Sequence, residues 1–120
     1  MFSESHQTGF RKHQGVNGEY MSRFLFKLEN IIADRKRNPC TDSYTSSLFA
    51  SGEDEIVKKV GEESVEVVLA AKAQGDERLV AEVADLMYHV LVLLASRDLS
   101  LDNVEAELEV RHGVIKSSSD

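Results

Sequence analysis

The stretch EDEIVKKVGEESVEVVLAAKAQGDERLVAEVADLMYHVLVLLASR, residues 53–97, decides the fold. Apolar residues recur through it at helical spacing, and Gly75-Asp76 interrupts the pattern once. Glycine is the usual residue just after a helix, and aspartate is a common N-cap of the next one. The stretch therefore predicts two long helices, over residues 53–74 and 76–97.

Shorter helical patterns flank this pair on both sides. We expect helices over residues 21–37, 43–51 and 101–112. Asn38-Pro39 ends the first of them, since a residue before proline avoids the helical region. Ser51 and Ser100 stand where N-caps of the helices that follow are expected. No strand-type alternation competes, so we predict an all-α fold, a helical bundle of about four to five helices per chain.

The ends of the chain lack a sustained apolar pattern. Residues 1–20 are polar and contain three glycines, which indicates a flexible arm or an expression remnant outside the fold. The serine-rich residues 114–120 read as a flexible tail. The length of 120 residues suits a single domain, which we place at residues 21–113.

Charge and composition exclude several classes of function. The formal net charge is −7, divided into +2 over residues 1–43 and −9 over residues 44–120. Such an acidic chain is a poor partner for nucleic acid or an anionic membrane. The single cysteine excludes an intrachain disulfide and a cysteine-based zinc site. Uninterrupted apolar runs are too short to span a membrane and no signal peptide is evident, so we expect a cytoplasmic protein.

Each long helix carries a narrow charged strip in apolar surroundings. On a helical wheel the first strip contains Lys59, Glu62, Glu63 and Glu66, and the second contains Arg78, Glu82, Asp85 and His89. A surface helix normally has the reverse proportions, a broad polar face and a narrower apolar stripe. Both helices must therefore be enclosed on most sides, and we predict that a second copy of the chain completes the bundle as a homodimer.

Five acids on two facing apolar helices require compensation. Buried like charges repel one another and lose hydration, and a divalent cation removes both costs. The spacing Glu-x-x-Glu and Glu-x-x-Asp puts two carboxylates on one face of each helix, so the expected ligands are Glu63, Glu66, Glu82 and Asp85. Oxygen ligands without cysteine favour Mg²⁺, with Mn²⁺ as a substitute. The competing interpretation is a solvated acidic face, and for His89 a structural hydrogen bond with Asp85 rather than metal ligation.

These residues resemble the phosphoribosyl-ATP pyrophosphohydrolases of histidine biosynthesis, within the all-α NTP pyrophosphohydrolases. The similar stretches are Ser43-Tyr44-Thr45 with Leu48 and Gly52, Lys58 to Glu63 with Glu66, and Glu82 to His89. The resemblance extends from about Phe24 to Arg111. It implies an intertwined homodimer and Mg²⁺-dependent hydrolysis of 1-(5-phosphoribosyl)-ATP, a small-molecule nucleotide, to 1-(5-phosphoribosyl)-AMP and pyrophosphate, the second step of the pathway.

Carried onto this sequence, the resemblance assigns roles to further residues. The four acids are the metal ligands, and either Glu62 or Glu63 is the general base. Lys59 either binds a phosphate oxygen or pairs with Glu63. From their place at the end of the first helix, Arg35 and Arg37 either contact phosphate or stay solvated as cations that suit a helix C-terminus. Ser43, Tyr44 and Thr45 are candidate contacts to the nucleotide or ribose, with simple packing as the alternative for Tyr44. Two other interpretations stay open: a house-cleaning NTP or dNTP pyrophosphohydrolase, and a non-enzymatic helical dimerisation module.

Overall fold

The computed structural model describes residues 18–113, with side chains from residue 24 onward. Five helices follow one another: α1 (Gly18–Arg37), α2 (Tyr44–Ser51), α3 (Glu53–Ala73), α4 (Asp76–Ser96) and α5 (Leu101–Arg111). No strand occurs in this part of the chain, which confirms the all-α class. The first helix begins at Gly18, three residues earlier than expected, and the rest of the expected arm and the tail lie outside the described residues.

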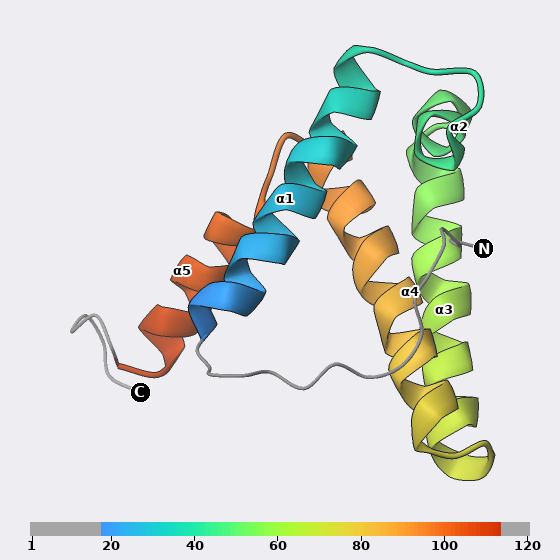
Figure 1. Ribbon diagram of the computed structural model, residues 1–120, viewed down its shortest axis with the longest axis vertical. Coiled ribbons are helices and arrows are strands. Elements are labelled where there is room, and N and C mark those ends of the chain that lie inside the picture. Colours follow the sequence, from blue (N-terminus) through green and yellow to red (C-terminus); the bar gives the residue numbers. More distant parts are fainter. Residues whose placement is uncertain (1–17, 114–120) are drawn as a thin grey trace.

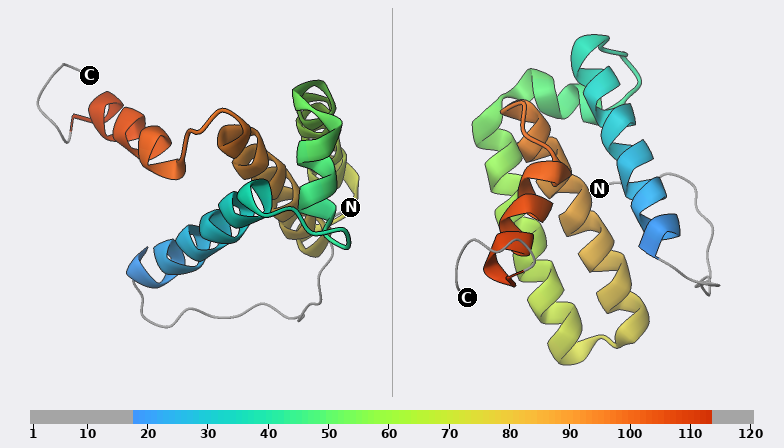
Figure 2. Two further views of the ribbon diagram at one scale, coloured as in Figure 1. Left: turned by 90° about the horizontal axis from the view of Figure 1, so that it is seen from above. Right: turned by 90° about the vertical axis from the view of Figure 1, so that its left-hand side faces the viewer.

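The long helices α3 and α4 form an antiparallel pair that is the centre of the fold (Figure 1). Their contact is the most extensive between any two elements of the described chain. Helix α1 crosses α4, and the short α2 lies over the beginning of α3 (Figures 1 and 2). Helices α1 and α2 also contact each other. The core between them is built from one or more residues of each of these four helices: Ile32, Leu48, Ile56, Tyr88, Leu91 and Val92.

Two of the expected helix caps are wrong. The residue before α3 is Gly52 at φ +100°, a conformation that favours glycine, while the Ser51 hydroxyl donates to the carbonyl oxygen of Ser47 at 2.9 Å. Gly75, at φ +90°, is the N-cap of α4, and Asp76 is already its first helical residue. The expectation for Ser100 is confirmed, because its side chain and that of Asn103 form a capping box at the start of α5.

Helix α4 is long and apolar enough to cross a membrane by length and composition alone. Its middle nevertheless carries three buried polar side chains, those of Glu82, Asp85 and His89. It packs against α3 on one side and α1 on another. A core helix of a soluble protein passes the same test of length and composition, and these features are those of a core helix.

Helix α5 stands apart from the other helices (Figure 2). None of its residues is buried. Its beginning is held by the main-chain amide of Leu101, which donates to Glu29 Oε2 on α1 at 2.6 Å. The body of the fold therefore consists of α1 to α4, and the expected site lies within it.

Candidate active site

The antiparallel pairing of α3 and α4 brings three acids together. Each of Glu63 on α3 and Glu82 and Asp85 on α4 offers a carboxylate oxygen within 4.8 Å of the others. Their relative exposures are only 8%, 5% and 7%. We call these three residues the acidic cluster. Three of the four expected ligands thus converge across the gap between the helices.

The other two acids of the α3 strip lie outside the cluster. Glu66 is half-buried one turn further along α3 and is not part of the group that could hold one ion. Glu62 is exposed, and its Oε1 accepts from Lys59 Nζ at 3.5 Å. The ion pair of Lys59 is therefore with Glu62, not with Glu63 as the helical spacing had suggested.

Burial and mutual repulsion raise the pKa of two carboxyls of the cluster, those of Glu63 and Asp85. Burial raises the pKa of Glu63, and the nearby charge of Asp85 raises it further. Burial also raises the pKa of the Asp85 carboxyl, and Glu82 adds to the effect. Without a cation, keeping Glu63 and Asp85 charged in the folded chain therefore costs free energy.

One basic partner of the cluster, Arg78, was placed on the second charged strip from the sequence but was given no role there. Arg78 Nη2 lies 2.8 Å from Glu82 Oε2, although the arginine itself is more than half exposed. Its position four residues before Glu82 on the same helix was the signal that could have identified it. Lys59 is the second cation near the cluster, because its charge acts on the pKa values of both Glu63 and Asp85.

The donor set of the cluster fits a hard divalent cation. It supplies three carboxylate groups and neither a thiolate nor an imidazole. Mg²⁺ and Mn²⁺ prefer such oxygen ligands, and a double positive charge would offset the repulsion that raises these pKa values. Glu63, Glu82 and Asp85 are therefore the residues of the described chain that could hold the ion.

A second group of side chains joins α2 to α4 directly beside the cluster. His89 is fully buried, with Nδ1 2.8 Å from the main-chain carbonyl oxygen of Asp85 and Nε2 3.2 Å from the Tyr44 hydroxyl. Tyr44 stacks on Tyr88 with ring centroids 6.2 Å apart, and Tyr88 packs edge-on against His89 at 4.9 Å. The interpretation of His89 as a hydrogen-bonded structural residue agrees with these contacts, but its acceptor is the backbone of Asp85 rather than the carboxylate.

The other two candidates of the Ser43-Tyr44-Thr45 segment have partners inside the chain. The Ser43 hydroxyl caps α2 by accepting from the amide of Ser46 at 3.0 Å. The hydroxyl of Thr45 is hydrogen-bonded to that of Tyr88. Both residues therefore have a structural role, and a contact with substrate stays a prediction.

The two candidate arginines lie away from the cluster within one chain. Arg35 lines a pocket with Glu53, which precedes Glu63 by ten residues and hence by about 15 Å along α3. Arg35 also pairs with its neighbour Asp34 at 3.3 Å. Arg37 lines a different pocket, between α1 and the end of α4. Of the three candidate phosphate-binding cations, only Lys59 lies beside the acidic cluster.

The raised pKa values predict how a variant of the cluster responds to pH in the absence of metal. Asp85 binds its proton more tightly folded than unfolded, so its charged form lowers the stability of the fold as pH rises. Asp85→Asn should therefore gain stability relative to the unmodified chain as the pH rises above about 4, the ordinary aspartate pKa. The gain should level off above the raised pKa.

The measurement is thermal unfolding of both proteins in EDTA between pH 4 and 8. The difference between the two is needed because burial lowers the pKa of His89, which acts on stability in the opposite direction. Taking the difference removes that contribution. A stability difference that does not change with pH would show that the Asp85 carboxyl is not perturbed by its surroundings.

Comparison with known proteins supports an enzymatic role for the chain. The family model described as phosphoribosyl-ATP pyrophosphohydrolase matches residues 25–112. A phosphoribosyl-ATP pyrophosphatase of Bacillus cereus (strain AH187) is 47% identical over 93 residues, which are 78% of this chain and 87% of the relative. One of Lactiplantibacillus plantarum is 50% identical over 94 residues, 78% of this chain and 89% of the relative.

A phosphoribosyl-ATP pyrophosphatase of Clostridium botulinum (strain Hall) is 52% identical over 84 residues, 70% of this chain and 76% of the relative. The matched region contains the acidic cluster and the Tyr44–His89 contact. The resemblance noted from the sequence is confirmed, and the non-enzymatic interpretation falls away. The chain belongs to the phosphoribosyl-ATP pyrophosphohydrolase family and is a hydrolase.

Proposed function

We propose that the chain hydrolyses 1-(5-phosphoribosyl)-ATP to 1-(5-phosphoribosyl)-AMP and pyrophosphate with the help of Mg²⁺, as the second step of histidine biosynthesis in the cytoplasm. The observation that carries the proposal is the buried acidic cluster of Glu63, Glu82 and Asp85, found in a chain of this family. One water is consumed, and the bond between the α- and β-phosphates is broken. Hydrolysis of a phosphoric anhydride depends on charge neutralisation and positioning.

The acidic cluster is the proposed metal site, with Mn²⁺ as a substitute for Mg²⁺. A bound ion would neutralise charge on the phosphate oxygens and lower the pKa of a bound water. Glu66, half-buried on the same helix, is the remaining candidate for a fourth ligand or for holding one through water. The three buried carboxylates need no rearrangement to face one ion, since their oxygens already lie within 4.8 Å.

The geometry favours Glu62 over Glu63 as the general base. Glu63 belongs to the cluster and is committed to the cation, whereas Glu62 is exposed and free to approach a water from the solvent side. Its present partner Lys59 is held only loosely, at 3.5 Å. Lys59 can therefore turn to a phosphate oxygen of the substrate while Glu62 accepts a proton from the attacking water.

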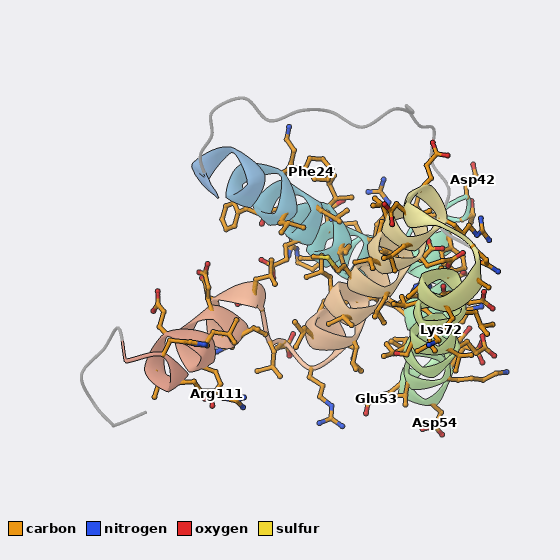
Figure 3. The ribbon with its side chains drawn as sticks, turned by 90° about the horizontal axis from the view of Figure 1, so that it is seen from below. Phe24, Asp42, Glu53, Asp54, Lys72 and Arg111 are labelled. Atoms are coloured by element: carbon orange, nitrogen blue, oxygen red, sulfur yellow. The ribbon has the colours of Figure 1, made fainter. Side chains whose placement is uncertain are left out.

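A second copy of the chain is the proposed partner, in an intertwined homodimer. Many apolar side chains of the three long helices stay exposed in the single chain: Phe24, Phe26, Ile31, Val57, Val65, Val68, Leu69, Val80 and Met87. Phe24, 59% exposed, projects outward from α1 (Figure 3). Apolar surface distributed along three helices is typical of a bundle that another chain completes. Such a partner could also supply the arginines that one chain places far from its own cluster.

Release of pyrophosphate from a panel of nucleotides tests the proposed reaction. We expect turnover of phosphoribosyl-ATP with Mg²⁺ or Mn²⁺, and a loss of turnover in EDTA that added Mg²⁺ restores. ATP and deoxynucleoside triphosphates are tested as alternative substrates. Preference for the ordinary nucleotides would replace the proposed substrate by that of a house-cleaning pyrophosphohydrolase, and turnover unaffected by EDTA would remove the role of the cation.

A further inference from the structure

We propose that the hydroxyl oxygen of Tyr44 is a fixed hydrogen-bond acceptor beside the acidic cluster, because its only proton is donated to His89. The Tyr44 oxygen accepts a hydrogen bond from an O–H group, either a water held at the cluster or a hydroxyl of the nucleotide. It does not bind a phosphate oxygen. The inference deepens the proposed function and rests on it for the identity of the ligand.

The first step fixes the tautomer of His89. Its Nδ1 lies 2.8 Å from the main-chain carbonyl oxygen of Asp85. A carbonyl oxygen can only accept, so Nδ1 must carry a hydrogen. The partner comes from the preceding turn of the same helix, and the ring is held from two sides by the edge-on contacts with Tyr44 at 5.9 Å and Tyr88 at 4.9 Å.

The second step assigns the proton between His89 and Tyr44. The imidazole is completely buried, and charging a buried ring is costly. In the neutral ring with a hydrogen on Nδ1, Nε2 has none and accepts. The Tyr44 hydroxyl, 3.2 Å away, must then be the donor.

The third step places the Tyr44 oxygen at the site. The Tyr44 hydroxyl is bonded to His89, which lies one turn beyond Asp85 on α4 and is itself bonded to the main chain of Asp85. The tyrosine is only half-buried, and within residues 24–113 its hydroxyl has no hydrogen-bond partner besides His89. With its proton directed at His89, the oxygen offers only lone pairs to the side of the cluster.

A tyrosine near a phosphate site is ordinarily read as a donor to phosphate oxygens. The Tyr44–His89 bond excludes that role here, since a phosphate oxygen is itself an acceptor. Waters around a divalent cation and ribose hydroxyls are both O–H donors that need an acceptor. Tyr44 therefore positions a water or reads a hydroxyl, and it distinguishes such groups from the phosphates next to them.

Nitrogen-15 NMR of labelled histidine tests the proton assignment directly and without substrate. The chain has four histidines, and the His89 signals are those that Tyr44→Phe shifts most. We expect a protonated Nδ1 and an unprotonated Nε2 in the unmodified protein, at neutral pH with or without Mg²⁺. A hydrogen on Nε2, in either the other tautomer or the imidazolium, would overturn the proposal.

Tyr44→Phe tests which group donates to the Tyr44 oxygen, because the variant keeps the ring and removes the hydroxyl, and with it both the acceptor and the hydrogen bond to His89. If the donor is a water at the cluster, the Kd for Mn²⁺ measured by calorimetry without nucleotide should rise about 5- to 10-fold, the loss of one hydrogen bond. If it is a hydroxyl of the nucleotide, the Kd for Mn²⁺ should stay unchanged while KM for phosphoribosyl-ATP rises by that factor. Either result supports the acceptor role of the Tyr44 oxygen. If neither the Kd for Mn²⁺ nor KM changes, that role is overturned.

Tyr88→Phe is the matched control. It removes a hydroxyl from the same aromatic group, one that is hydrogen-bonded to Thr45. We expect the Kd for Mn²⁺ and KM to stay within twofold of the unmodified values. If Tyr88→Phe changes the same constant by as much as Tyr44→Phe does, the effect is structural and the specific role of Tyr44 is overturned. Should the unmodified chain release no pyrophosphate, the proposed reaction fails, while the NMR and Mn²⁺ measurements still decide the role of Tyr44.

Discussion

Glu63→Gln should reduce pyrophosphate release from phosphoribosyl-ATP by about a thousandfold, equivalent to ~4 kcal/mol of transition-state stabilisation. Glu63 is the α3 member of the acidic cluster, and the other two members are on α4. If the proposed cation binds at the cluster, the loss of Glu63 would remove its one buried ligand on α3, so the ion and the phosphates would be held less firmly between the two helices. Steady-state assays at saturating Mg²⁺ measure the effect.

The same substitution should leave the fold intact. In EDTA the variant should unfold at the same temperature as the unmodified protein or higher, because the change removes a buried negative charge beside two others. Glu105→Gln is the matched control, the same change on an exposed residue of α5. Equal losses of activity in the two variants, or full activity of Glu63→Gln, would refute the role of the acidic cluster.

The second large effect concerns stability. Ile32→Ala should lower the free energy of unfolding by about 2–5 kcal/mol. Ile32 is 1% exposed and belongs to the core where α1 meets α2, α3 and α4. The truncation removes apolar burial and leaves a cavity that a packed core closes only in part. Urea denaturation at one fixed protein concentration measures the change, since association of chains also affects stability.

The neighbouring residue provides the control for this comparison. Ile31 is 43% exposed on the same helix, and Ile31→Ala is chemically the identical change. We expect it to cost much less than Ile32→Ala at protein concentrations low enough to keep the chains apart, since the proposed second chain would cover Ile31. Equal costs would contradict the assignment of Ile32 to the core and Ile31 to its outer face.

The order and extent of the helices followed from local signals in the sequence. Proline and glycine interrupt the apolar periodicity, and the observed ends of α3, α4 and α5 lie within one residue of the expected ones. The cap of α3 was wrongly assigned to Ser51 because Gly52, the actual N-cap, takes a conformation with positive φ that a cap pattern does not encode. The early start of α1 was missed because polar residues carry no periodic signal.

The acidic cluster was only partly predictable, for a geometrical reason. A helical wheel shows which residues share a face, so it grouped Glu62, Glu63 and Glu66 on one strip. It does not show which turn of that face meets the partner helix, and only Glu63 lies opposite Glu82 and Asp85. The positions of Arg35 and Arg37 depend on how α1 crosses α4, and nothing in the local sequence encodes that crossing.

The isolation of α5 has a consequence for the dynamics of the chain. An eleven-residue helix is marginal in water by itself, and this one has no buried residue and a single main-chain anchor at Leu101. Its amide hydrogens should therefore exchange with solvent through local opening, long before those of α3 and α4, which need the core to unfold. In a single chain α5 should therefore be the first helix to open, and docking against a second chain would turn it into a protected element.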